Sequence, residues 1–95
     1  MASSGAEEPR FTLCDAAVWR DVDGEIVALD VESGSYFSLN GSGRLLWLAL
    51  LEPRSTGALA GVLAESFGIP KEQAQSDAAA FVGDLVERGL VEADA

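Results

Sequence analysis

Few side chains in this sequence are suited to catalysis or metal binding, and those few are scattered. Cys14 is the only cysteine, histidine is absent, and 16 acidic residues are spread along the chain. Catalysis at neutral pH usually needs a tunable base beside a nucleophile, and metal sites need clustered histidine, cysteine or carboxylate ligands. Gly41-Ser42-Gly43 lacks the following lysine of a phosphate-binding loop. The sequence therefore predicts a protein that is not an enzyme and holds no metal or cofactor, which leaves binding as its chemistry.

Length, charge and cysteine content restrict the partners. With 95 residues, 48% of them hydrophobic, the chain can form one small domain. Six basic and 16 acidic residues give a net charge of −10, which disfavours nucleic acid and anionic membranes and favours a basic peptide. Cys14 is expected to be a small core or half-buried residue rather than a reactive thiol. The lone cysteine and the lack of a signal peptide or membrane span predict a cytoplasmic protein.

Alternating apolar residues in the first 40 positions predict a three-stranded antiparallel sheet. The expected strands lie within residues 11–21, 25–31 and 35–39, separated by turns at Asp23-Gly24 and Ser33-Gly34. In the second strand, Val27, Leu29 and Val31 share one face. The residues before the sheet, 1–10, are expected to form a disordered tail, which leaves residues 11–93 as the folded domain.

The third strand is predicted to leave one backbone edge open. Phe37 and Leu39 should point inward, and Tyr36 and Ser38 outward. No later strand is expected beside it, so its N–H and C=O groups stay unpaired unless the domain dimerises or a peptide adds as another strand. Four or five backbone bonds of about 1 kcal/mol each offset only the lower end of the about 4 to 15 kcal/mol lost on association. Affinity and specificity therefore require an apolar pocket beside the strand.

Three helices are predicted in the second half of the chain. The first follows Asn40 as N-cap and is apolar on nearly every side until Pro53 stops it. The second covers residues 56–67, with a cap at Ser55-Thr56 and Gly68 at its end; the third covers residues 70–88 and ends on Gly89 and Leu90 in a Schellman arrangement.

The last two helices have the spacing of a helix-turn-helix, but the charge of the third does not suit DNA. Four acidic residues stand against two basic ones there: Glu72, Asp77, Asp84 and Glu87 against Lys71 and Arg88. A helix that enters a DNA groove should be basic, because phosphate contacts dominate affinity. A DNA-binding winged-helix regulator therefore stays only as an alternative.

Taken in order, these residues resemble the PqqD-like family over about residues 19–91. The matching positions are Ile26-Val27-Ala28-Leu29-Asp30, Tyr36-Phe37-Ser38-Leu39-Asn40, Trp47, Thr56, Asp77, Phe81, Leu85 and Gly89-Leu90. The resemblance implies a small α+β domain, winged helix-turn-helix-like, with a three-stranded antiparallel sheet followed by three helices. It also implies a recognition element for ribosomally made, post-translationally modified peptides. Gly41-Ser42-Gly43, at the start of the first helix, departs from the family pattern.

The resemblance further implies a binding site and a role. A precursor's leader peptide would pair antiparallel with the third strand and pack against the third helix. The implied peptide-binding residues are Ser33, Gly34, Ser35, Tyr36, Phe37, Ser38, Leu39, Gln73, Asp77, Ala80, Phe81 and Asp84. Asp77 matches a position commonly kept acidic and could pair with a basic leader residue. In a lasso-peptide pathway the domain would present the leader to a separate leader peptidase or modifying enzyme.

Other interpretations of these features stay open. The protein could be a PqqD-type peptide chaperone of pyrroloquinoline quinone synthesis. It could instead be an interaction domain that forms an edge-strand dimer, although we expect a monomer. Phe37 and Leu39 are most simply core residues, and Asp77 and Asp84 are most simply solvated helix charges.

Overall fold

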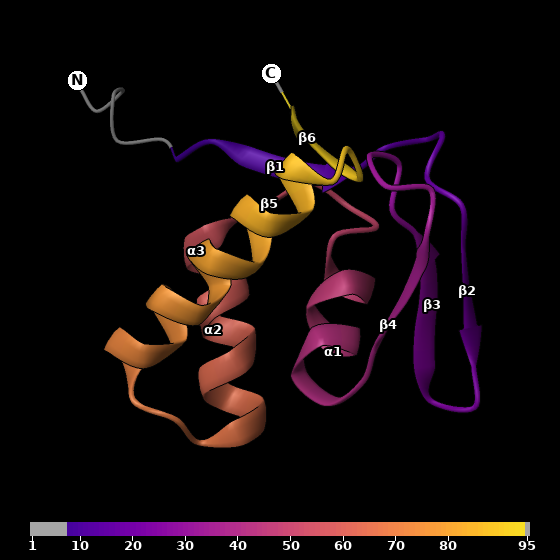
Figure 1. Ribbon diagram of the computed structural model, residues 1–95. Coiled ribbons are helices and arrows are strands. Elements are labelled where there is room, and N and C mark those ends of the chain that lie inside the picture. Colours follow the sequence, from indigo (N-terminus) through magenta and orange to yellow (C-terminus); the bar gives the residue numbers. More distant parts are fainter. Residues whose placement is uncertain (1–7, 95) are drawn as a thin grey trace.

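The computed structural model describes residues 8–94, which form two antiparallel sheets and three helices (Figure 1). One sheet has the order β2-β3-β4 and comprises β2 (Trp19–Val22), β3 (Glu25–Leu29) and β4 (Tyr36–Leu39). The other has the order β5-β1-β6 and comprises β5 (Arg54–Ser55), β1 (Arg10–Leu13) and β6 (Val91–Asp94). The helices are α1 (Gly41–Ala49), α2 (Thr56–Phe67) and α3 (Lys71–Glu87). In Figure 1, α1 lies between the β2-β3-β4 sheet and the α2-α3 pair.

The predicted α+β, winged helix-turn-helix-like fold is confirmed, and the β2-β3-β4 sheet is the predicted meander. Its first hairpin turns at Asp23 and Gly24, which both have positive φ (52° and 83°) as a type I′ turn requires. Within the predicted tail, residues 1–10, Arg10 belongs to β1, and residues 1–7 lie outside the part of the chain that the structure describes.

One face of β3 is buried in the hydrophobic core. Ile26 and Ala28 are fully buried, whereas Val31, on the face that the sequence singled out, is 57% exposed. Ala28 lies opposite Trp19 of β2, and the Trp19 ring meets the Trp47 ring of α1 edge-on, with centroids 5.7 Å apart. This face of β3 therefore packs into the core beside the paired indole rings.

The predicted long first strand is wrong, because the chain divides between the two sheets. Residues 15–16 form a turn in which the Ala17 N–H donates to the Cys14 carbonyl at 3.0 Å. Before that turn, β1 pairs with β6 from Leu13 opposite Val91 to Arg10 opposite Asp94. The strand β6 was not predicted, since its four residues Val91–Asp94 are too few to show a period and follow directly on a helix terminator.

The ends of the helices largely follow the sequence signals. The Ser55 hydroxyl accepts a hydrogen bond from the Ala58 N–H at 3.0 Å and begins α2, which ends at Gly68 with φ of 66°. The Schellman arrangement after α3 is confirmed by bonds from the Gly89 N–H to the Val86 carbonyl and from the Leu90 N–H to the Leu85 carbonyl. Asn40 is the N-cap residue of α1, as predicted, although its side chain makes no capping hydrogen bond.

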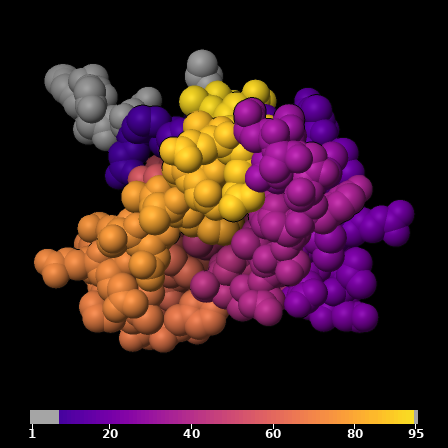
Figure 2. Space-filling model, in the orientation of Figure 1, coloured from indigo at the N-terminus to yellow at the C-terminus, as the bar shows by residue number. Residues whose placement is uncertain are grey.

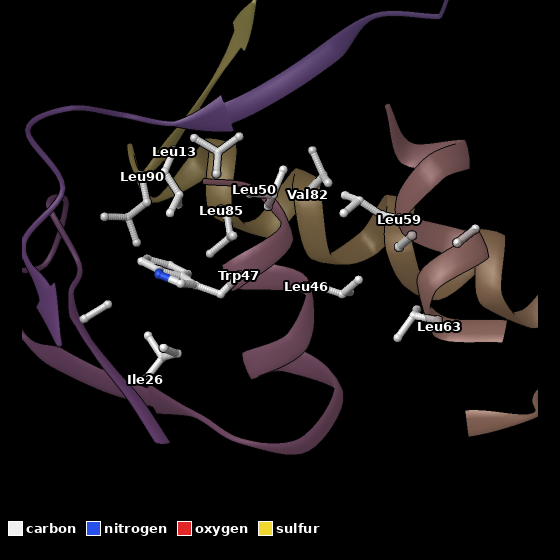
Figure 3. Close-up of a cluster of buried hydrophobic side chains, with 14 of the residues drawn as sticks. Leu13, Ile26, Leu46, Trp47, Leu50, Leu59, Leu63, Val82, Leu85 and Leu90 are labelled. Carbon is white, nitrogen blue, oxygen red and sulfur yellow. The ribbon is translucent and has the colours of Figure 1, made fainter. Parts of the chain in front are cut away.

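The hydrophobic core joins all three helices to both sheets (Figure 3). Trp47 is fully buried at its centre, among Ile26 of β3, Leu85 of α3 and Leu90 before β6. The Trp47 Nε1 atom is buried without a hydrogen-bond partner among residues 8–94. Burial of this N–H group without a partner destabilises the fold by about 1 to 3 kcal/mol. Burial of the indole, about 150 to 250 Å² at about 25 cal/mol per Å², contributes more and decides its position.

Candidate functional site

The edge of β4 that faces away from β3 is unpaired within residues 8–94. The Asp30 N–H donates to the Ser35 carbonyl at 2.8 Å, which fixes which residues of the strand bond to β3. Because antiparallel hydrogen bonding alternates, Tyr36 and Ser38 direct their N–H and C=O groups toward the open side. This edge can therefore accept and donate backbone hydrogen bonds to a further strand.

The side chains of β4 alternate as the sequence predicts. Tyr36 and Ser38 are exposed, with Tyr36 at 65%, whereas Phe37 and Leu39 are half-buried and pack against the core. A peptide strand at this edge would consequently meet Tyr36 on the outer face of the sheet and the helices on the inner face.

A cavity of about 320 Å³ lies near the point where β4 leads into α1. Its lining comes from all three helices and from the connection between α2 and α3: Ser42, Leu46, Leu63, Phe67, Ile69, Gln73, Asp77 and Phe81. Figure 2 shows the surface hollowed where orange α3 faces the magenta segment of β4 and α1. Most of these side chains are apolar, and Gln73 and Asp77 add polar groups on the α3 side. The cavity can therefore hold an apolar side chain beside a carboxylate.

The structure brings together only part of the predicted site. Gln73, Asp77 and Phe81 line the cavity, as their spacing of four residues along α3 suggests. Ala80 and Asp84 are exposed on α3 but lie outside the cavity lining. The turn residues Ser33, Gly34 and Ser35 are exposed ahead of β4, at the opposite end of the strand from the cavity.

Sequence reasoning missed the apolar half of the cavity. Leu46, Leu63 and Ile69 come from three separate segments, so no local pattern joins them. Phe67, the last residue of α2, is 48% exposed and lines the cavity. The aromatic side chain at the last position of this helix is the one local signal in the sequence for the apolar half of the cavity.

Arg88, at the end of α3, connects that helix to the sheet. Its Nη1 donates to Asp30 Oδ2 at 2.7 Å, its Nε donates to Asp84 Oδ2 at 3.1 Å, and its guanidinium lies 4.6 Å from the centroid of the Phe37 ring. The hydrogen bond to Asp84, together with the charges of Asp84 and Asp30, raises the pKa of Arg88 against the effect of burial. This cluster lies near the end of β4 that follows the turn.

The chemistry of the described residues suits binding. Residues 8–94 contain no group of three or more histidine, cysteine, aspartate or glutamate side chains that could hold a metal ion. Cys14 is half-buried, as predicted, and burial, with help from the charges of Glu92 and Asp15, raises the pKa of its thiol. The thiol is therefore protonated at neutral pH and is a poor nucleophile. Among residues 8–94, no helix is both long and apolar enough to cross a membrane.

The open strand β4 beside a cavity lined by the three helices places the protein among small α+β domains of the winged helix-turn-helix-like class, as the sequence predicted. Residues 25–91 match the family model described as coenzyme PQQ synthesis protein D (PqqD), and the chain belongs to that family. A comparison with curated proteins gives no match.

Two solved structures share the fold along nearly their whole length. TbiB1 in complex with the TbiA(beta) leader peptide is 25% identical, with a TM-score of 0.76 over 88% of this chain and 98% of that chain. A lasso peptide synthetase B1 complexed with the leader peptide is 30% identical, with a TM-score of 0.73 over 86% of this chain and 96% of that chain. The resemblance stated from the sequence is thereby confirmed.

Proposed function

We propose that this protein binds the leader segment of a ribosomally synthesised precursor peptide and presents it to a separate leader peptidase or modifying enzyme in lasso-peptide biosynthesis. The observation that carries the proposal is the open edge of β4 beside an apolar cavity. Both similar solved structures contain a leader peptide, which supports the same role here. The protein itself contributes binding and no catalytic step.

In the proposed complex the leader adds as a strand antiparallel to β4. The backbone groups of Tyr36 and Ser38 exchange hydrogen bonds with it, and these bonds alone give little net affinity. A large apolar leader side chain that enters the cavity adds about 1.5 to 3 kcal/mol. The peptide-binding set is the one implied by the resemblance, extended by the cavity residues Leu46, Leu63, Phe67 and Ile69.

The antiparallel direction fixes how the leader crosses the site. Its N-terminal end lies beside Leu39 and the cavity, and its C-terminal end leaves past Ser35 and the turn before β4. The precursor's remaining residues then continue away from the domain on that side. A bound leader raises the effective concentration of this part of the precursor at the second enzyme without any contact from this domain to the reacting bond.

The description of the matching family model favours one other candidate, a peptide chaperone for pyrroloquinoline quinone synthesis. Its site would work by the same strand addition, so the two candidates differ in the precursor that is bound. Binding assays with the precursor of each pathway distinguish them.

Fluorescence anisotropy tests the proposed function directly. A labelled leader from the short precursor gene nearest to this gene is titrated with the protein, and a scrambled leader and duplex DNA serve as controls. We expect saturable binding of the leader at micromolar or lower concentration and none of the controls. Equal binding of the scrambled leader, or binding of DNA alone, would refute the proposal.

A substitution at the open edge tests strand addition itself. Ser38→Pro removes an N–H group that points away from β3, and proline is tolerated on edge strands for that reason. We expect leader affinity to fall at least about tenfold, because the proline also obstructs the approach of a new strand. Ser38→Ala, which keeps the backbone donor, is the matched control and should bind as the wild type does. Circular dichroism verifies that both variants remain folded.

A further inference from the structure

The two walls of the proposed groove meet at one charged cluster. The open strand β4 and the helix α3 belong to different parts of the fold, and α1 lies between the sheet and the α2-α3 pair (Figure 1). Arg88 reaches from the end of α3 to Asp30, the residue after β3, and stacks on Phe37 of β4. The guanidinium thus contacts both the helix wall and the strand wall.

Asp30 is built into the sheet and is a rigid anchor for this contact. It is 8% exposed, and its Oδ1 accepts hydrogen bonds from the N–H groups of Glu32 at 2.9 Å and Ser33 at 3.3 Å. Its Oδ2 accepts from Arg88 at 2.7 Å. The carboxylate therefore fixes the turn that precedes β4 with one oxygen and α3 with the other.

We propose that Arg88 is a positioning residue for peptide recognition, which holds the open edge of β4 at a set distance from α3 through Asp30 and Phe37. This inference rests on the proposed function. A leader strand must pair with β4 and contact α3 at once, so its affinity depends on that distance being fixed before the leader binds. The Arg88–Asp30 pair acts through the geometry of the groove, because Asp30 bonds to Ser35 from the β3 side, away from the open edge.

A direct role for Arg88 is the rival explanation. Asp84, the second partner of Arg88, is 56% exposed, so a carboxylate of the leader could replace it on the guanidinium. The two roles predict different effects of Asp30→Asn. If Arg88 is a positioning residue, loss of the Asp30 charge weakens the contact that holds the groove and should weaken leader binding. If Arg88 contacts the leader directly, the same change leaves Arg88 free for that contact and should preserve or improve leader binding.

The chain offers a matched control for Arg88. Arg44 of α1 also pairs with an aspartate from the β2-β3-β4 sheet region, and its two hydrogen bonds to Asp21 of β2 measure 2.7 and 3.2 Å. The side chains of Arg44 and Arg88 are similarly exposed, at 35% and 34%. The Arg44 pair lies at β2, the sheet edge opposite β4, and outside the cavity lining. Arg44 therefore tests the loss of an arginine–aspartate pair of similar exposure that lies away from the proposed groove.

Leader affinity is measured by anisotropy for Arg88→Met, Arg44→Met and Asp30→Asn, with the labelled leader that the wild-type protein binds. We expect Arg88→Met to raise Kd about tenfold, Asp30→Asn about threefold to tenfold, and Arg44→Met less than about twofold. The double variant Asp30→Asn/Arg88→Met should bind no more weakly than Arg88→Met alone, because the Arg88–Asp30 contact is already lost in Arg88→Met. Arg88→Lys keeps the charge without the planar guanidinium group, and its Kd for the leader should lie between those of wild type and Arg88→Met.

Several outcomes would overturn the proposal. Unchanged affinity in Arg88→Met removes any role for the residue, and unchanged or tighter binding in Asp30→Asn assigns Arg88 to a direct contact. An equal loss in Arg44→Met reduces the effect to general stability, which thermal unfolding of each variant measures separately. If Arg88→Met does not fold, Arg88→Lys and Asp30→Asn give the same decision. Failure of the wild-type protein to bind any leader refutes the proposed function instead, so the two failures are distinguishable.

Discussion

Adjacent residues of β4 have different surroundings, and their substitutions should have different effects. Tyr36 is 65% exposed on the outer face of the sheet, whereas Phe37 lies under the Arg88 guanidinium. Cross-strand contacts of an exposed aromatic contribute about 0.2 to 1 kcal/mol. We therefore expect Tyr36→Ala to weaken leader binding up to about fivefold and to leave the melting temperature nearly unchanged. A loss above tenfold in the anisotropy assay would show that Tyr36 is a main anchor.

Asp30 gives the fold a defined dependence on pH. Burial acts to raise its pKa, but the hydrogen bonds from Glu32 and Ser33 and the charge of Arg88 outweigh burial, so the pKa lies below its ordinary value of 3.8. A carboxyl with a depressed pKa in the folded state stabilises that state above its unfolded pKa. That stabilisation is lost as the pH falls through the folded pKa.

The stability difference between wild type and Asp30→Asn should therefore be largest near neutral pH and shrink below about pH 4. Urea unfolding at pH 7 and at successive values between pH 5 and pH 2.5 measures that difference. Glu65→Gln, a change at an exposed carboxylate of α2, is the control for overall charge. A difference that is constant over this range would contradict the assigned role of Asp30.

At the scale of elements, the end of α3 matters more than its middle. Gly89 adopts φ of 76°, and a Cβ there would lie 3.4 Å from the Val31 Cβ. An alanine in this left-handed conformation costs about 1 to 2 kcal/mol, so Gly89→Ala should lower the melting temperature by about 4 to 16 °C. Gly83 lies inside α3 with open space around it, and Gly83→Ala should raise stability by about 0.5 to 1 kcal/mol. Thermal unfolding should show a lower melting temperature for Gly89→Ala and a higher one for Gly83→Ala. Shifts of the two melting temperatures in the same direction would contradict this prediction.

The elements that the sequence predicts well are those with local signals. The second helix was expected at residues 56–67 and lies there, because Ser55 and Gly68 mark its ends. The third helix and the β3–β4 hairpin were predicted for the same reason, because local residues mark where they end or turn. The pairing of β1 with β6 brings together residues about 80 positions apart, such as Leu13 and Val91, and no local period announces it. The division of the first predicted strand is a consequence of that distant pairing.

The candidate site shows the same limit. The α3 residues of the cavity could be predicted, since Asp77 and Phe81 share a helix flank at a spacing of four. Leu63 and Ile69 belong to other segments and meet them only when α2 packs on α3. The Arg88–Asp30 contact joins residues 58 positions apart and depends on how α3 is placed against the sheet. Alternation alone predicted which β4 side chains point outward, namely those of Tyr36 and Ser38.

The charge of the whole molecule bears on how a leader reaches the site. A net charge of −10 attracts a basic peptide over distances of about the Debye length, which is about 10 Å at 0.1 M salt and 3 Å at 1 M. Within the groove, Asp77 is exposed and lines the cavity, so a basic leader residue beside the apolar anchor would meet it there. The apolar contact is insensitive to salt at this level, which separates the two contributions.

We expect the association rate of a basic leader to fall several-fold between 0.05 and 0.5 M salt, with a smaller change in the dissociation rate. Asp77→Asn keeps the shape of the cavity and removes its charge, so it should weaken binding up to about fivefold at low salt and little at high salt. Stopped-flow anisotropy over a salt series measures both rates. Glu72→Gln changes the net charge equally at a residue outside the cavity lining and is the matched control. Because both variants alter long-range attraction alike, any excess effect of Asp77→Asn reports a contact inside the groove, and its absence would leave Asp77 as a solvated helix charge.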